Sequence, residues 1–195
     1  MNRDNALFTV IGLLGGFIAG YVLHEQMSAV QPARRLAGSG AAAQTADAAP
    51  AAPSPAPAGM EMERLRARLE ADPNDAVAIL QLANLNFDIQ NWARARELYE
   101  RHLKLQPGNP DVLTDLGICL RAQGDFQAAL ARFHEAQGLS PDHWHSRFNE
   151  VVVLTFDLKD FAQAERKLAD LEKLAPGDAN VSRLAAELRK LRDAS

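Results

Sequence analysis

The stretch QGDFQAALARFHEAQGLSP, residues 123–141, contains a turn, one amphipathic helix and a proline that ends the helix. Apolar residues recur along it at spacings of three and four, as they do on the buried side of a helix. The same pattern occurs earlier in QNWARARELYERHLKLQP, which ends at Pro107, and later in KDFAQAERKLADLEKLAP, which ends at Pro176. A helix that recurs at so regular a period predicts a stack of repeated units.

Each of these helices follows another predicted helix, in AVAILQLANLNFDIQ, PDVLTDLGICLRAQ and HSRFNEVVVLTFDLK. The pairs Leu82-Ala83, Leu116-Gly117 and Val151-Val152 occupy matched places in our alignment, and the extra residue of the third unit is assigned to the loop at 141–144. Each hairpin leaves apolar surface on both sides, so the units are expected to stack.

The features that recur from unit to unit are a polar-aromatic start, a small residue, a large residue and a closing proline. They are Asn91-Trp92, Asp125-Phe126 and Asp160-Phe161; Ala95, Ala129 and Ala164; Tyr99, Phe133 and Leu168; and Pro107, Pro141 and Pro176. This pattern resembles the tetratricopeptide repeat family over residues 76–178. Departures include Asn86, where an aromatic residue is usual, and His102, where a small one is usual.

The resemblance implies an all-α fold, an α-solenoid of three helix hairpins at about 76–109, 110–144 and 145–178. Capping helices are expected on both sides, at Met60–Pro73 upstream and at 179–192 downstream, because such stacks need polar ends. We assign residues 60–193 to this repeat domain.

The resemblance also implies a concave groove, lined by the first helix of each pair, that binds a protein or a peptide. The groove residues expected from the family's pattern are Leu80, Asn84, Phe87, Asp88, Ile118, Arg121, Asn149, Val153 and Phe156, with Val77, Asp111, Thr114, Ala122, Ser146 and Asp157 beside them. The apolar members are interpreted as a strip without a core role, which suggests a partner; the alternative is that each is simply an exposed helix residue.

Some family members bind carboxylate-ended peptides through a basic cluster. Leu80, Asp115, Ser146 and Glu150 stand where basic residues would be needed. The sequence therefore predicts a different mode of binding here.

The N-terminal part contains an apolar run, Leu7–Leu23, that carries no charge. At 1.5 Å per residue this is roughly 25 Å, the short end of a membrane span. We predict that this run is a single transmembrane helix that is retained in the mature protein, within an anchor at 1–30. One alternative is a cleaved signal peptide, which would leave a soluble periplasmic protein. The other is a buried core helix, which the glycines disfavour. From the layout alone we expect a single-pass protein of a bacterial inner membrane with a periplasmic repeat domain.

Small residues recur on one side of this run. Gly12, Gly16 and Gly20 are spaced by four and permit close contact with another membrane helix. We expect this side to contact either a second copy of the chain, which gives a homodimer, or the membrane helix of a partner protein. The alternative is that the spacing of the glycines arises by chance.

Residues 31–59 form the predicted linker. Its part at 37–59 holds eleven alanines, four prolines and one charged residue, too little apolar surface to offset the entropy of ordering. We expect a disordered spacer.

Composition and motifs argue against catalysis. The formal net charge is −4, which disfavours nucleic acid. The neighbouring His143 and His145 lack a recognisable third ligand, and Cys119 has no activating neighbour in sequence. We expect no cofactor, no metal and no enzymatic activity.

These expectations combine into a membrane-tethered scaffold that assists assembly of an envelope complex. The layout, without any motif, is similar to the membrane-anchored factors of cytochrome c maturation. The alternative is a structural subunit that is held in a membrane complex mainly through its transmembrane helix.

Overall fold

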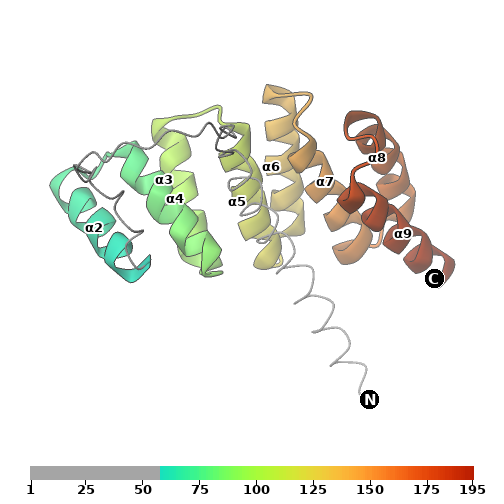
Figure 1. The fold of residues 1–195 in the computed structure, drawn as a ribbon, viewed down its shortest axis with the longest axis horizontal. Helices are drawn as coiled ribbons and strands as arrows, with labels where there is room; N and C mark the ends of the chain where they lie inside the picture. The colour runs from blue at the N-terminus through green and yellow to red at the C-terminus, as the bar shows by residue number, and fades with distance from the viewer. Residues whose placement is uncertain (1–57) are drawn as a thin grey trace, which may run out of the picture. The chain divides into compact units, whose positions relative to one another are not determined.

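The structure is a computed structural model, and it describes residues 58–195. A leading helix, α2 (Ala58–Ala71), precedes three helix pairs: α3 (Ala76–Asp88) with α4 (Trp92–Leu105), α5 (Pro110–Ala122) with α6 (Phe126–Leu139), and α7 (Trp144–Val152) with α8 (Phe161–Leu174). A π-helical turn, η1 (Val153–Asp157), continues α7, and α9 (Ala179–Asp193) follows α8 (Figure 1). The all-α prediction is confirmed for this part of the chain, where no strand occurs.

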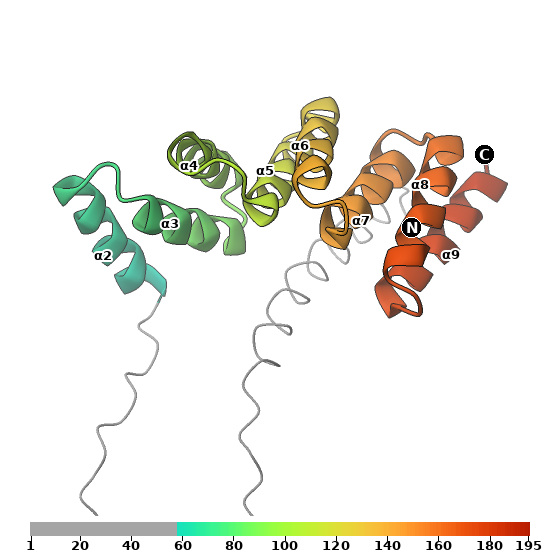
Figure 2. The ribbon, with the colours of Figure 1, turned by 90° about the horizontal axis from the view of Figure 1, so that it is seen from above.

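The helices form two rows. The first helices α3, α5 and α7 make one row, and the second helices α4, α6 and α8 make the other (Figure 2). Each helix packs on the next along the chain, and α5 also packs on α7. This is the arrangement expected of stacked hairpins, in which each unit covers the apolar surface of its neighbour.

Aspartate side chains set where several of the helices begin. Asp75, Asp125 and Asp160 each accept a hydrogen bond from the backbone N–H three residues later, at 2.9–3.2 Å. Such caps satisfy N–H groups that have no partner inside the helix. At the other end, each second helix stops two residues before a proline, because proline disfavours helical backbone in the residue before it.

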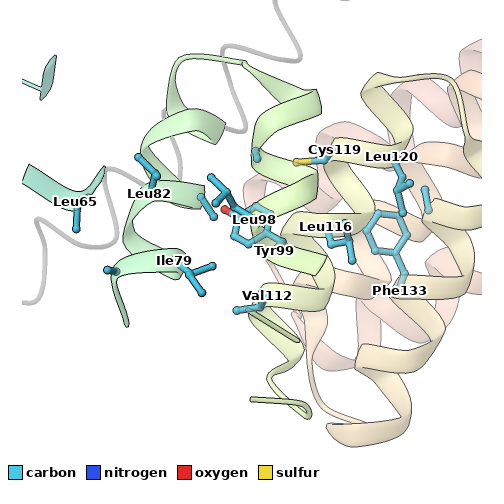
Figure 3. Packing of buried hydrophobic residues seen from close by; sticks show 14 of the residues in the cluster. Leu65, Ile79, Leu82, Leu98, Tyr99, Val112, Leu116, Cys119, Leu120 and Phe133 are labelled. Carbon is cyan, nitrogen blue, oxygen red and sulfur yellow. The ribbon is translucent and has the colours of Figure 1, made fainter. Parts of the chain in front are cut away.

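The core consists of two adjoining buried clusters. One joins α2 with the first two helix pairs, and the other joins the third pair with α9. Figure 3 shows Leu98 and Tyr99 of α4 between side chains of α3 and of α5. In the second pair the ring of Phe133 occupies the space that a side chain at Gly117 would need.

The structure corrects the position of the extra residue in the third repeat. The first helices begin at Ala76, Pro110 and Trp144, which are evenly spaced, whereas the second helices begin at Trp92, Phe126 and Phe161, where the last interval is longer by one. The additional residue therefore lies inside the first helix, in η1, and the prediction that it sits in the loop at 141–144 is wrong.

The π-helical turn absorbs this residue by widening the helix. Leu158 N–H donates to the carbonyl of Val153, five residues earlier, at 3.0 Å, which is the π-helical pattern. In α7, the residue that corresponds to Gly117 is Val151, whereas the sequence comparison had matched Gly117 with Val152. From α8 onward, the residues correspond as the sequence comparison predicted.

The predicted span Leu7–Leu23, its glycines Gly12, Gly16 and Gly20, and most of the predicted linker lie outside the described residues. Within residues 58–195, no helix is long and apolar enough to cross a membrane.

Candidate partner-binding face

Most of the predicted groove residues lie on the exposed side of the first helices. We call it the first-helix face. Its residues are Val77, Leu80, Asn84, Phe87 and Asp88 of α3, Asp111, Asp115, Ile118, Arg121 and Ala122 of α5, and His145, Phe148, Phe156 and Asp157 of α7 and η1.

The α3 part of this face combines exposed and half-buried side chains. Val77 is 54% exposed, and Asn84 and Asp88 are exposed as well. Phe87 is half-buried, because its ring packs edge-on against Trp92 and Tyr99, with ring centroids 5.2 and 6.2 Å away. Leu80 likewise packs against the core.

The apolar strip is therefore not free of a core role. Ile118 packs against the first buried cluster and Phe156 against the second, as Leu80 and Phe87 do against the first. Each of these side chains shows one edge to solvent and one to the core. Substitutions here change stability as well as any binding.

The structure buries four of the residues expected in or beside the groove: Thr114 of α5, which is 4% exposed, and three residues of the third repeat. Ser146 and Val153 are 0% exposed and Asn149 is 5% exposed. For Ser146 and Asn149 the cause is the one-residue shift ahead of η1, which moves the matching positions to His145 and Phe148, both half-buried. Counting from the helix starts rather than from the closing prolines would have given these two residues. Val153 shifts to Val152, which is 1% exposed, so this position is buried in either register.

An ion pair joins α5 to η1 on this face. Arg121 Nε donates to Asp157 Oδ2 at 2.5 Å, and the two side chains are 21% and 18% exposed. Both are positions that the sequence assigned to the groove. Because the guanidinium is already engaged, its charge is balanced before any partner arrives.

Carboxylates dominate the middle of the face. Asp115 is half-buried, and burial, together with repulsion from Asp111 and Asp88, raises its pKa to about 7, although a hydrogen bond with Tyr99 acts in the opposite direction. The Tyr99 hydroxyl lies 2.9 Å from Asn84 Oδ1, so its single proton can be donated to either Asn84 or Asp115. Asp115 was not among the predicted partner-binding residues, because a polar residue on an exposed helix side carries no signal by itself.

The two histidines, His143 just before α7 and His145 in its first turn, do not form a metal site with other described residues. His143 Nε2 lies 2.9 Å from Asp111 Oδ1, and the ring of His145 stacks on Trp144. Among residues 58–195, no group of three or more metal-ligating side chains is placed to hold an ion. Cys119 is buried, and burial raises the pKa of its thiol to about 12, so the reactive thiolate is not populated at neutral pH.

Several solved structures share this arrangement of helices. The chain matches crystal structures of MamA, one of them with a TM-score of 0.60 and 20% identity over 68% of this chain and 74% of that chain. It also matches the first TPR domain of Spaghetti (RPAP3) bound to an HSP90 peptide, with a TM-score of 0.55 and 20% identity over 63% of this chain and 94% of that chain. At these identities the similarity shows the fold.

Two further similarities involve larger proteins. The TPR repeat-containing thioredoxin TTL4 of Arabidopsis thaliana is 26% identical over 132 residues, which is 63% of this chain and only 19% of the relative. An O-GlcNAc transferase of Thermobaculum terrenum matches with a TM-score of 0.54 and 23% identity over 60% of this chain and 22% of that chain. The chain thus spans about a fifth of either protein.

Two family models, both described as tetratricopeptide repeat, match residues 80–143 and 120–188, and together they span all three helix pairs. The chain belongs to the tetratricopeptide repeat family.

Proposed function

We propose that the chain is a membrane-tethered scaffold that holds a protein or peptide segment on its first-helix face and assists assembly of an envelope complex. The observation that carries the binding function is the face itself. Three adjacent first helices present partly exposed apolar side chains, among them Val77, Phe87 and Phe156, beside exposed polar ones. A solved TPR domain of similar fold carries a bound HSP90 peptide.

The contacts between repeats support binding by a preformed surface. Arg121 of α5 is paired with Asp157 of η1, and Asp111 of α5 lies against His143, which precedes α7. These contacts fix two neighbouring helices relative to each other. A preformed surface loses less conformational entropy when a partner binds.

The mode of binding differs from capture of an acidic chain end. The peptide bound to the RPAP3 domain has the sequence SRMEEVD, with acidic residues near its end. On the first-helix face here, Asp88, Asp111 and Asp115 are acidic, and Arg121 is already paired. An acidic peptide would meet charge of its own sign, which costs affinity.

The tether and the compartment rest on the sequence. The apolar run Leu7–Leu23 and the spacer after it support a domain that is held near a membrane on the periplasmic side. Protease added outside the cytoplasmic membrane is expected to cut around Pro50–Pro57 and release the repeat domain. Full protection until the membrane is broken would place the domain in the cytoplasm, and a soluble protein that lacks the apolar run would indicate a cleaved signal.

Partner binding is tested by adding bulk to the face without disturbing the core. Val77 and Ala122 are exposed, so we expect Val77→Arg with Ala122→Arg to abolish recovery of the partner from solubilised membranes while cooperative unfolding is unchanged. The matched control is Ala93→Arg with Ala131→Arg, at exposed positions of α4 and α6. Equal recovery by both double variants would contradict the proposal.

A further inference from the structure

We infer that the first-helix face selects a polypeptide segment in which lysine or arginine side chains alternate with apolar ones, supplied by a separate protein. The inference rests on the proposed function and names the chemistry of the partner. It follows from the charges on α3 and α5, from an unpaired acceptor on α7 and from the apolar side chains on both sides of them.

Three carboxylates lie within electrostatic range of one another. Asp111 and Asp115 lie one turn apart on α5. Burial raises the pKa of the Asp115 carboxyl, and repulsion from Asp111 and from Asp88 raises it further. The side chain of Asp111 is 76% exposed and lies against the partly buried His143. Within residues 58–195, no lysine or arginine forms an ion pair with Asp88 or Asp115, so no cation of this part of the chain is fixed against these two carboxylates.

The neighbouring helix adds an acceptor that lacks a donor. Asn149 occupies on α7 the position that Asp115 occupies on α5, counted from the start of each helix, and the two helices pack on each other. Asn149 is 5% exposed; its Nδ2 donates to the carbonyl of His145 at 2.9 Å, but its Oδ1 has no hydrogen-bond partner. An unpaired buried acceptor costs free energy, and this one lies beneath the face, in the row of helices that forms it.

The carboxylates of the face call for hydrogen-bond donors with positive charge. Lysine offers three donors and arginine five, and neither has an acceptor. A bound divalent cation is disfavoured, because no group of three ligating side chains is arranged for one within residues 58–195. A cationic side chain needs no such geometry.

Apolar side chains flank the charged region on both sides. Leu80 and Phe87 lie on α3, and Phe148 and Phe156 lie on α7 and η1, all half-buried. Aromatic faces also attract lysine and arginine when the cation is placed over the ring. A segment that fits therefore carries basic residues toward α5 and apolar residues toward α3 and α7.

The test uses the purified full chain and three labelled peptides with one framework, GLAXLAXLAG, in which X is lysine, glutamine or glutamate. Binding is measured by fluorescence anisotropy at low and at moderate salt. We expect the lysine peptide to bind roughly tenfold more tightly than the glutamine peptide, and the glutamate peptide most weakly, with the lysine preference reduced by salt.

Variants assign the preference to the face. Asp88→Asn, Asp111→Asn and Asp115→Asn combined are expected to remove it. The matched control, Glu97→Gln, Glu135→Gln and Glu172→Gln combined, changes the net charge equally on exposed positions of the second helices and is expected to retain it. A preference that survives the aspartate variant or disappears in the control would overturn the inference.

The remaining outcomes separate the inference from the proposed function. Equal binding of all three peptides, lost in Val77→Arg with Ala122→Arg, would leave the binding function standing and overturn the charge selection. No binding of any peptide would contradict both. If Arg34→Gln with Arg35→Gln strengthens binding of the lysine peptide, the occupant is this chain's own N-terminal segment, and the assignment to a separate protein is wrong.

Discussion

Gly117 lies where α5 packs closely against a side chain of α6. A Cβ atom added there would overlap the ring of Phe133, which is itself fully buried. We expect Gly117→Ala to lower the free energy of unfolding by about 1–3 kcal/mol, because the ring must move within a packed core. Urea unfolding followed by circular dichroism measures this change.

Another helical glycine gives the control. A Cβ atom added at Gly138 of α6 would meet no atom within 4 Å. Gly138→Ala is expected to raise stability by up to about 1 kcal/mol, because alanine favours the helix. If both alanine variants change stability alike, the close approach of α5 to Phe133 is not what stabilises the pair.

Glu150 is a buried carboxylate with three donors around it. It is 1% exposed, and it lies 2.7 Å from Lys167 Nζ, 2.8 Å from His134 Nε2 and 3.0 Å from Gln137 Nε2. Burial alone would raise the pKa of this carboxyl, but the hydrogen bonds from Lys167, His134 and Gln137 outweigh burial and hold the pKa below its ordinary value. The ionised form therefore stabilises the junction of α6, α7 and α8.

This contribution depends on pH in a definite direction. It is complete above the unfolded-state pKa of 4.5 and is lost as pH falls through the lower folded-state value. Glu150→Gln is expected to cost about 1–3 kcal/mol at pH 7, and the difference from the unchanged chain is expected to shrink below pH 4.5. Unfolding curves across this range test it, with the exposed Glu172→Gln as control; a difference that is constant with pH would contradict it.

At the scale of elements, η1 is the feature that distinguishes the third repeat. Removing Thr155 brings the rest of this repeat into the spacing of the second one, so that Phe156 and Asp157 match Arg121 and Ala122. The deletion also removes a buried hydroxyl that has no hydrogen-bond partner. We expect the chain without Thr155 to fold with its free energy of unfolding within about 1 kcal/mol of the original.

The same deletion in a regular helix is expected to be far more harmful. Leu120 is the residue of α5 that matches Leu154, the residue directly before Thr155, and it is buried. Deleting it rotates one half of α5 against the other and removes a core side chain, at a cost of about 2–5 kcal/mol or more. Similar losses from both deletions, measured by thermal unfolding, would show that η1 is not the site of the extra residue.

The sequence predicted the helix pairs because their signals are local and repeated. The aspartates before α6 and α8 and the prolines after α4, α6 and α8 mark helix ends by rules of short range. The position of the extra residue was missed because the closing prolines alone do not say where inside a unit a residue is added. That error placed Ser146 and Asn149, which are buried, in the predicted groove.

Charge arrangement on the face was the other part that the sequence could not supply. Asp88 and Asp115 lie in different repeats, and only the packing of the first repeat against the second brings their charges within range. The pairing of Arg121 with Asp157 likewise depends on how α5 meets η1. Pairings over such separations carry no local pattern.

At the scale of the whole described domain, the two rows of helices differ in the side chains that they expose. The second helices display i,i+3 and i,i+4 ion pairs such as Arg94–Glu97 and Arg132–Glu135, which are exposed and contribute little to stability. Exposed leucines also end the second helices, at Leu105, Leu139 and Leu174, so the two rows differ in charge rather than in apolar exposure. The first helices carry Asp88 and Asp115, with which no lysine or arginine of the described residues forms an ion pair. We infer from this asymmetry that the first-helix face is the binding surface.

Site-specific photocrosslinking in membranes tests this assignment most directly. A photoreactive amino acid is placed at exposed positions of the first helices, Val77 and Ala122, and at exposed positions of the second helices, Ala93 and Ala131. We predict that one protein is crosslinked from Val77 and from Ala122, and that neither second-helix position yields it. Crosslinks to that protein from Ala93 and Ala131, with none from the first helices, would contradict the assignment.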